Sequence, residues 1–183
     1  MRTIADHLTD ITQNSIKAGA KNIFVDFIED TPKNMIKFKI RDDGCGMDEN
    51  DLEKIFDPFF THRDHKIRKV GIGLSLLKEN CELTGGYVKV ESKKGKGTIV
   101  EALFKSNSID IPPLGDLPSA FVSLITFSDN VDFTIKREYN NKVYTVDTKD
   151  LKEALGVSLR EPVVYKELLN FIEKKEREIK KNA

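Results

Sequence analysis

The sequence has few of the features that mark exported, membrane-spanning or nucleic-acid-binding proteins. Its only cysteines, Cys45 and Cys81, lack metal-ligand spacing, so we expect two free thiols in a reducing cytoplasm. No apolar run approaches membrane-spanning length, and Asp6 stands where an export signal would need an apolar core. The 30 basic side chains balance 30 acidic ones, so no net charge draws the chain to nucleic acid or a membrane surface.

Two common phosphate-binding motifs are also missing. No Gly-x-x-x-x-Gly-Lys-Ser/Thr occurs, which excludes a P-loop. Gly71-Ile-Gly73 lacks the third glycine and the preceding strand of a dinucleotide-binding fingerprint. Any nucleotide site must therefore be built in another way.

Hydrophobic periodicity predicts an α/β arrangement in the N-terminal part of the chain. Helical spacing predicts helices at residues 3–18, 48–55 and 74–83. Alternation predicts strands at residues 22–28, 35–40, 87–91 and 98–104. The first two of these strands are close enough in sequence to form an antiparallel hairpin.

The C-terminal part carries no recognisable chemical motif. Proline, glycine and serine mark residues 106–119 as a linker between residues 1–105 and a C-terminal extension over residues 120–183. In the extension we expect strands at 120–127, 132–138 and 142–146, and helices at 150–155 and from Pro162 onward. We interpret these elements as packing on or beside the N-terminal sheet.

Two Gly-x-Gly turns are the most informative feature of the sequence. Asp42 precedes Gly44 and Gly46, and a carboxylate at the end of a strand can accept a hydrogen bond from the exocyclic amine of adenine. Gly71 and Gly73 open an apolar helix, whose first N–H groups and positive dipole end favour phosphate. Taken alone, either turn could equally be a flexible surface turn.

The first predicted helix places three polar side chains on one face. Asn14 offers an amide oxygen that suits Mg²⁺ held chiefly by phosphates, and Lys17 could contact phosphate oxygens. Asp10 could orient or deprotonate a water or a hydroxyl beside a γ-phosphate. Taken alone, these three residues would be interpreted as a polar helix face in water.

In this order, the motifs resemble the GHKL ATP-binding superfamily of gyrase, a class of heat-shock chaperones, histidine kinases and mismatch-repair ATPases. Its boxes match residues 10–19, 42–47, 55–61, 71–76 and 95–98. The resemblance implies a Bergerat fold, a two-layer α/β sandwich in which helices pack on a mixed sheet. Mg²⁺-ATP is then expected between the helices and the sheet.

Carried over by position, the resemblance implies a set of nucleotide contacts. Asn14 is the expected Mg²⁺ ligand, Asp42 the adenine anchor and Asp10 the catalytic carboxylate. Residues 62–70 resemble the ATP lid. The other contacts are expected at Lys17, Gly44, Gly46, Met47, Arg63, Lys69, Gly71, Ile72, Gly73, Leu74 and Thr98.

Two departures from the superfamily leave the use of ATP open. Members that hydrolyse ATP usually carry glutamate at the position of Asp10, whose side chain is one methylene shorter, so hydrolysis should be slow or absent. The first box begins almost at Met1, so we expect no helical hairpin with a phosphoacceptor histidine on this chain.

The favoured hypothesis is a stand-alone, kinase-like regulatory module that acts on a separate protein partner. One alternative is a slow ATPase acting as a conformational switch, in which ATP orders the lid and drives homodimerisation or the release of a partner. Another is a non-enzymatic, ATP-sensing binding module of the anti-sigma type. ATP and Mg²⁺ are the expected cofactors in each case, and no nucleic acid or membrane partner is expected.

Overall fold

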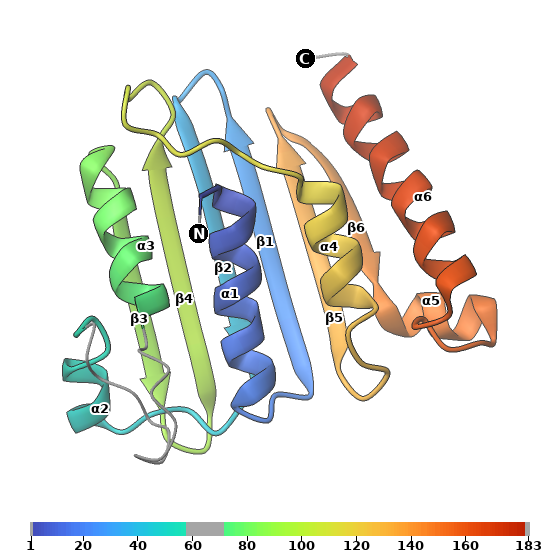
Figure 1. Cartoon of the computed structure of the whole chain (residues 1–183), viewed down its shortest axis with the longest axis horizontal. Helices are drawn as coiled ribbons and strands as arrows, with labels where there is room; N and C mark the ends of the chain where they lie inside the picture. The colour runs from blue at the N-terminus through green and yellow to red at the C-terminus, as the bar shows by residue number, and fades with distance from the viewer. Residues whose placement is uncertain (1, 58–71, 182–183) are drawn as a thin grey trace.

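A computed structural model describes residues 2–57 and 72–181, which form a six-stranded mixed sheet with helices against one face (Figure 1). The strands are β1 (Asn22–Asp30), β2 (Met35–Asp42), β3 (Tyr87–Lys93), β4 (Gly97–Lys105), β5 (Asp132–Tyr139) and β6 (Lys142–Asp147). The helices are α1 (Ile4–Lys17), α2 (Glu49–Glu53), α3 (Ile72–Leu83), α4 (Leu117–Ile125), α5 (Thr148–Leu155) and α6 (Pro162–Lys181).

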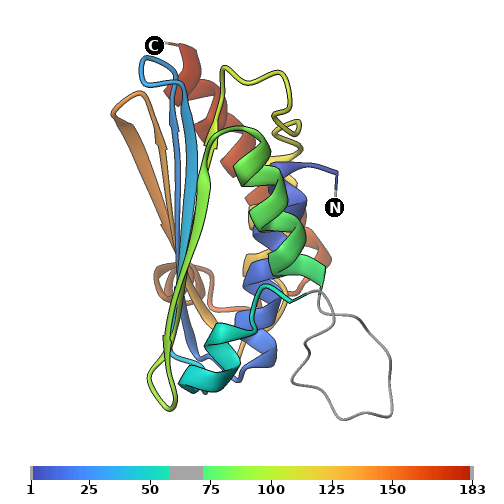
Figure 2. The same ribbon diagram turned by 90° about the vertical axis from the view of Figure 1, so that its left-hand side faces the viewer.

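The strand order is β3-β4-β2-β1-β5-β6, and among these described strands the β1–β5 pair is parallel and the other pairs are antiparallel. Figure 2 shows the sheet as one layer and α1, α3, α4 and α6 as the other. This arrangement confirms the predicted two-layer α/β sandwich.

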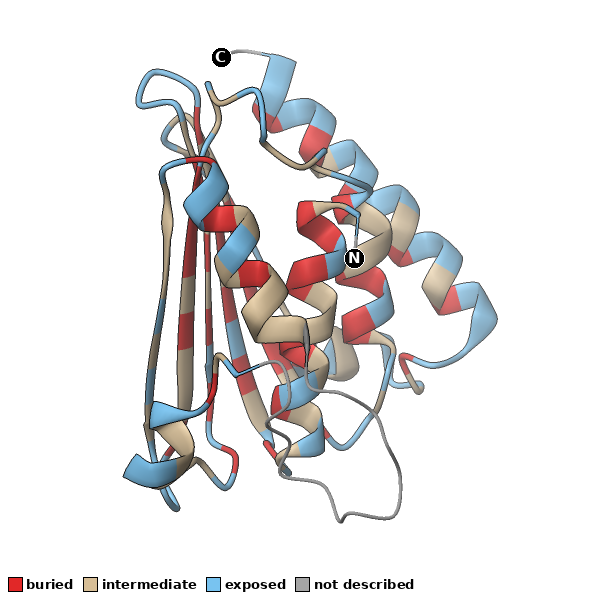
Figure 3. Cartoon of the chain, turned by 60° about the vertical axis from the view of Figure 1, so that its left-hand side comes forward, coloured by how far each residue is buried: buried red, intermediate tan, exposed pale blue. Residues whose placement is uncertain are grey.

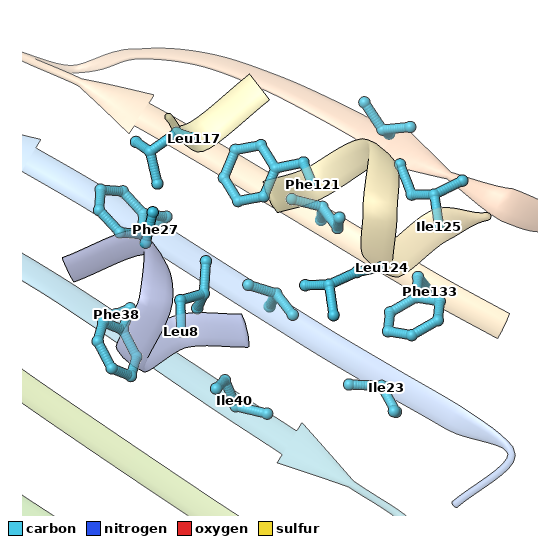
Figure 4. Close-up of a cluster of buried hydrophobic side chains, with 14 of the residues drawn as sticks. Leu8, Ile23, Phe27, Phe38, Ile40, Leu117, Phe121, Leu124, Ile125 and Phe133 are labelled. Carbon is cyan, nitrogen blue, oxygen red and sulfur yellow. The ribbon is translucent and has the colours of Figure 1, made fainter. Parts of the chain in front are cut away.

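The core lies between the sheet and the helices, where buried residues concentrate (Figure 3). Phe27 of β1 is its centre: its ring stacks on Phe38 at a centroid distance of 6.4 Å and meets Phe121 of α4 edge-on at 6.3 Å (Figure 4). These contacts join strands β1 and β2 to α4 in one apolar layer. Burial of such large side chains supplies most of the stabilising free energy.

The opposite face of the sheet carries charges of alternating sign. In register across five strands lie Lys136, Asp26, Lys39, Glu101 and Lys89. Side chains of opposite sign in adjacent strands attract one another while remaining solvated. This face therefore needs no covering layer, which explains why the helices occupy only one side.

The prediction of a strand at residues 120–127 is wrong, because residues 117–125 form α4. Asp116 caps this helix by accepting a hydrogen bond from the Ser119 N–H, and Pro118 lies in its first turn. Its buried residues follow a helical repeat and cover β1 and β5; they are Leu117, Phe121, Val122, Leu124 and Ile125. The apolar run 120–127 satisfies both periodicities, and the cap decides between them.

The segment before α4 is docked on α1. The carbonyls of Pro113 and Leu114 accept hydrogen bonds from the N–H groups of Ile4 and Ala5 at 2.9 and 3.0 Å. The N–H groups in the first turn of a helix have no acceptor within the helix, so the carbonyls of this segment supply the missing acceptors. The segment therefore fixes the start of α1, the helix that carries Asp10, Asn14 and Lys17.

Beyond α4 the chain extends the same sheet. β5 pairs in parallel with β1, and a turn at Asn140-Asn141, with positive φ angles of 46° and 70°, joins β5 to β6. Gly156 ends α5 in the left-handed conformation. The C-terminal strands thus continue the sheet beyond β1, while α4 packs against α1 and α6 packs against α4.

Candidate functional site

Asp42 is the centre of a hydrogen-bond cluster where α1, β2 and β4 meet. Its side chain is buried, and the Ser15 hydroxyl donates to Oδ2 at 2.5 Å. The N–H groups of Gly44 and Thr98 donate to Oδ1 at 2.9 and 3.2 Å. A carboxylate has roughly four acceptor positions, so Oδ2 keeps one for a further donor. An adenine amine is a donor of the required kind.

The neighbouring Asp43 has a different role. Its carboxylate accepts hydrogen bonds from the Lys21 N–H at 2.7 Å and from the backbone and side-chain amides of Asn22 at 2.9 and 2.8 Å. Partial desolvation raises the pKa of Asp43, but the hydrogen bonds from Asn22 and Lys21 outweigh it, so the pKa lies below its usual value. Asp43 therefore stabilises the connection between α1 and β1.

The turn after Asp42 is held from both sides. The Cys45 N–H donates to the Ala18 carbonyl at 2.9 Å, and the Met47 N–H donates to the Ser92 hydroxyl at 2.9 Å. The Ser92 oxygen also lies 2.9 Å from the Thr98 hydroxyl. Met47 and Thr98 are thus brought together with Asp42, through Ser92.

Three glycines of this region lie where side chains would collide with the surrounding backbone. A Cβ on Gly44 would lie 3.0 Å from the Ala18 carbonyl oxygen. Gly46 and Gly97 have φ angles of +62° and +93°, and a Cβ on either would overlap a carbonyl group. Glycine is therefore required at Gly97, where β4 approaches the Asp42 carbonyl, and at Gly46, which approaches the Lys93 carbonyl. At Gly44 a Cβ would need its neighbours to shift slightly.

Replacing Gly97 by alanine is expected to destabilise the protein by at least ~3 kcal/mol, because left-handed strain adds to a collision with the Asp42 carbonyl. Gly95, in the same turn, also has a positive φ, but a Cβ added there would have no atom of the described residues within 4 Å. Gly95→Ala should therefore lose only ~1–2 kcal/mol. Urea unfolding of the two variants compares them, and equal losses would contradict the packing described for Gly97.

On α1, Asp10 is partly buried, whereas Asn14 and Lys17 are exposed. The side chain of His7 on the same helix meets Asn80 of α3, with the Asn80 Nδ2 atom 2.8 Å from His7 Nε2. This contact identifies the face of α1 that lies against α3. Asp10 and Asn14 follow His7 by three and seven residues, so they lie along the same seam.

The two helices run in opposite directions (Figure 1). Asn14 lies seven residues after His7, and Gly73 lies seven residues before Asn80. With equal rise per residue, Asn14 is therefore level with the first turn of α3. That turn contains Ile72, Gly73 and Leu74, and its N–H groups have no partners within the helix.

The structure thus brings the predicted residues into two neighbouring groups. Asp42, Gly44, Gly46, Met47 and Thr98 surround the carboxylate, and Asp10, Asn14 and Lys17 lie on α1 near the first turn of α3. Predicted contacts outside the described residues are Arg63, Lys69 and Gly71. Ser15 and Ser92 were not predicted. Ser15 directly follows Asn14 and could have been found there, whereas no motif marks Ser92.

The donor set fits Mg²⁺ only if phosphates supply most of its ligands. Within residues 2–57 and 72–181, no three His, Cys, Asp or Glu side chains gather into a metal-binding group. Mg²⁺ commonly keeps water ligands and takes few protein oxygens when it accompanies phosphates. The exposed amide of Asn14 beside a helix N-terminus suits that mode of binding.

His7 makes the fold sensitive to acid. It is fully buried, and burial lowers its pKa from 6.5 to about 4. The unfolded chain therefore binds more protons between these pH values, so the free energy of unfolding decreases as the pH falls through this range. Between pH 7 and 5, the wild type should lose about 2 kcal/mol more than His7→Leu in urea unfolding. Equal losses would contradict the burial of a neutral imidazole.

Comparisons with known proteins agree with this fold. A profile of the family described as "Histidine kinase-, DNA gyrase B-, and HSP90-like ATPase" matches residues 2–108. Sensor histidine kinase YvrG of Bacillus subtilis is 31% identical over 100 residues, which cover 54% of this chain and 17% of that protein. Sensor histidine kinase WalK of the same organism is 30% identical over 102 residues, which cover 53% and 17%. The chain thus spans less than a fifth of these relatives.

A solved structure described as the N-terminal domain of a DNA repair protein has a TM-score of 0.58 at 15% identity. The match covers 80% of this chain and 52% of the other. At this identity the likeness concerns the fold alone. Among the helices of the described residues, none is long and apolar enough to cross a membrane.

Proposed function

Because this chain belongs to the histidine kinase-, DNA gyrase B- and HSP90-like ATPase family, we propose that it binds Mg²⁺-ATP between the Asp42 cluster and the first turn of α3. The observation that carries the proposal is the buried Asp42 carboxylate, which three donors orient and which keeps one acceptor position. Adenine can fill that position with its amine, whereas guanine presents a carbonyl oxygen at the corresponding ring position.

In this proposal one group of residues binds the base, and the other binds the phosphates and Mg²⁺. Asp42 accepts from the adenine amine, and Gly44 allows the base to approach the backbone. The first N–H groups of α3 and the Lys17 ammonium neutralise phosphate charge. The Asn14 oxygen would be a protein ligand of a Mg²⁺ ion that the phosphates and water also coordinate.

We further propose that the γ-phosphoryl group passes to a separate protein, as in a kinase. The Asp10 carboxylate lies on the α1 face that carries Asn14, where it can accept the proton of an attacking hydroxyl or orient a water. Its short side chain reaches less far than a glutamate, so hydrolysis should be slow. Transfer of the γ-phosphoryl group to a positioned acceptor, with ADP as the leaving group, can then be faster than hydrolysis of ATP by water.

The test uses ATP labelled at the γ-phosphate, the full chain and proteins that co-purify with it. Label should move to a partner with the wild type and not with Asn14→Ala. Absence of transfer to every partner would contradict the kinase proposal. Phosphate release without an acceptor, abolished in Asp10→Asn, would instead support the slow ATPase switch.

A second function, ATP-dependent binding without catalysis, is favoured by the position of α4. This helix packs against α1, which carries Asn14, and so connects the nucleotide site to residues 120–183. We propose that these residues contact the partner, or a second copy of the chain in a homodimer. Partner retention that depends on ATP and is lost in Asp42→Asn, with no phosphoryl transfer, would support this function.

The free thiols Cys45 and Cys81 support a reducing compartment, and we propose the cytoplasm.

A further inference from the structure

A polar contact links the two helices of the site about 10 Å from the expected phosphates. His7 of α1 is fully buried, and its Nε2 atom lies 2.8 Å from the side-chain amide of the half-buried Asn80 of α3. The Phe104 ring of β4 lies beneath the imidazole at a centroid distance of 6.5 Å. We call the pair His7 and Asn80 the α1–α3 clasp.

The clasp stabilises the fold less than an apolar pair of the same size would. Burial keeps the imidazole neutral, so Nε2 can accept from Asn80 while the proton resides on Nδ1. Nδ1 is buried and has no hydrogen-bond partner among the described residues. An unsatisfied buried polar atom is destabilising, whereas a leucine at this position would have no such atom. The contact therefore contributes a fixed geometry rather than stability.

That geometry concerns the phosphate end of the site. A directional hydrogen bond defines how far α3 lies along α1, which a layer of aliphatic contacts specifies less well. Because α3 is rigid, its position at Asn80 also determines where its first turn lies relative to Asn14. If the first turn of α3 shifted by about 1 Å along α1, the amides of Gly73 and Leu74 could no longer contact the phosphates while the Asn14 oxygen contacts the Mg²⁺ ion bound to them.

We propose that His7 is a positioning residue, which acts through Asn80 to hold the first turn of α3 at the height of Asn14 and thereby sets the affinity for the phosphates of ATP. This inference rests on the proposed ATP site. The clasp should not affect the base, because Asp42 is held by Ser15, Gly44 and Thr98, none of which belongs to α3.

The experiment compares the affinities of a non-hydrolysable Mg²⁺-ATP analogue and of adenosine, both measured by NMR titration of the full chain. His7→Leu and Asn80→Leu should each weaken binding of the analogue by about tenfold, the value of one net hydrogen bond, and leave adenosine binding within about twofold. The double variant should be no weaker than either single variant. His7→Gln, whose Oε1 can accept from Asn80, should recover most of the affinity. Glu79→Ala, an exposed change on α3, is the matched control.

The outcomes test the positioning role of the clasp separately from the proposed ATP site. Equal weakening of analogue and adenosine would show a merely structural role and overturn the clasp. So would additive losses in the double variant, or unchanged binding in both single variants. If His7→Leu fails to fold, Asn80→Leu and His7→Gln still measure the ratio of the two affinities. Failure of the wild type to bind the analogue would instead overturn the proposed ATP site, and the clasp with it.

Discussion

Replacing Asp42 by asparagine is expected to weaken ATP binding by about a hundredfold or more, because a buried acceptor becomes a donor. The asparagine oxygen can keep the bonds from the Gly44 and Thr98 amides. Its Nδ2 group then takes the place of Oδ2, where it faces the Ser15 hydroxyl and the adenine amine. Two donors would oppose each other at the base. Isothermal titration calorimetry with Mg²⁺-ATP measures the loss.

Asp43→Asn is the matched control for this prediction. The same replacement of one oxygen by an amide group is made at the next residue, but the side chain of Asp43 bonds to Lys21 and Asn22, on the connection between α1 and β1, and not to the Asp42 cluster. It should lose about 1 kcal/mol of stability and bind ATP within about twofold of the wild type. If both variants lost affinity equally, Asp42 would have no special role in binding the base.

The largest effect on stability is expected from Arg137→Met, at about 3–5 kcal/mol. Arg137 has no exposed side-chain surface, although it lies in a strand. Its guanidinium donates to Glu176 of α6 at 2.9 Å and to Glu29 of β1 at 2.6 Å, and the Tyr144 hydroxyl also donates to Glu176 at 2.9 Å. Removing the arginine leaves two largely buried carboxylates close together, and the partly exposed Lys180 ammonium, 3.9 Å from Glu29 and 3.7 Å from Glu176, compensates their charge only in part. Urea unfolding measures the loss.

Lys136→Met tests whether this loss is specific to the buried cluster. Lys136 precedes Arg137 in β5 but faces the open side of the sheet, where it lies 3.6 Å from Glu138. An exposed pair of this kind contributes less than ~1 kcal/mol. Arg137→Met should also leave ATP affinity within about twofold in the folded protein. Similar stability losses for the two variants would contradict a buried ionic anchor for α6.

Much of this fold follows from local patterns, and the exceptions have identifiable causes. The alternation of β1 and β2 and the asparagine turn between β5 and β6 predict elements that the structure contains. The prediction for segment 120–127 failed because a fully apolar run fits a buried helix as well as a strand. The Arg137 cluster is harder still: alternation puts Arg137 on the core side, but nothing near it in sequence indicates Glu176, 39 residues away.

In the candidate site, too, local motifs predict some residues, whereas others depend on contacts between distant segments. Motifs were sufficient to single out Asp42, Asn14 and the glycines, because backbone conformation and charge restrict which residues these positions accept. The residues that orient them come from elsewhere: Ser92 belongs to a strand without a motif, and Asn80 lies two turns into α3. Such contacts depend on tertiary packing, which no local pattern encodes.

The central claim is that the Asp42 cluster selects adenine and the first turn of α3 binds the phosphates. The most direct test is a titration of the wild-type chain with Mg²⁺-ATP and, separately, with Mg²⁺-GTP, followed by backbone amide NMR shifts. We predict saturable binding of one ATP, with the largest shifts at Gly44, Thr98 and Gly73, and binding of GTP that is weaker by about tenfold or more. No saturation with ATP, or equal affinity for GTP, would contradict this claim.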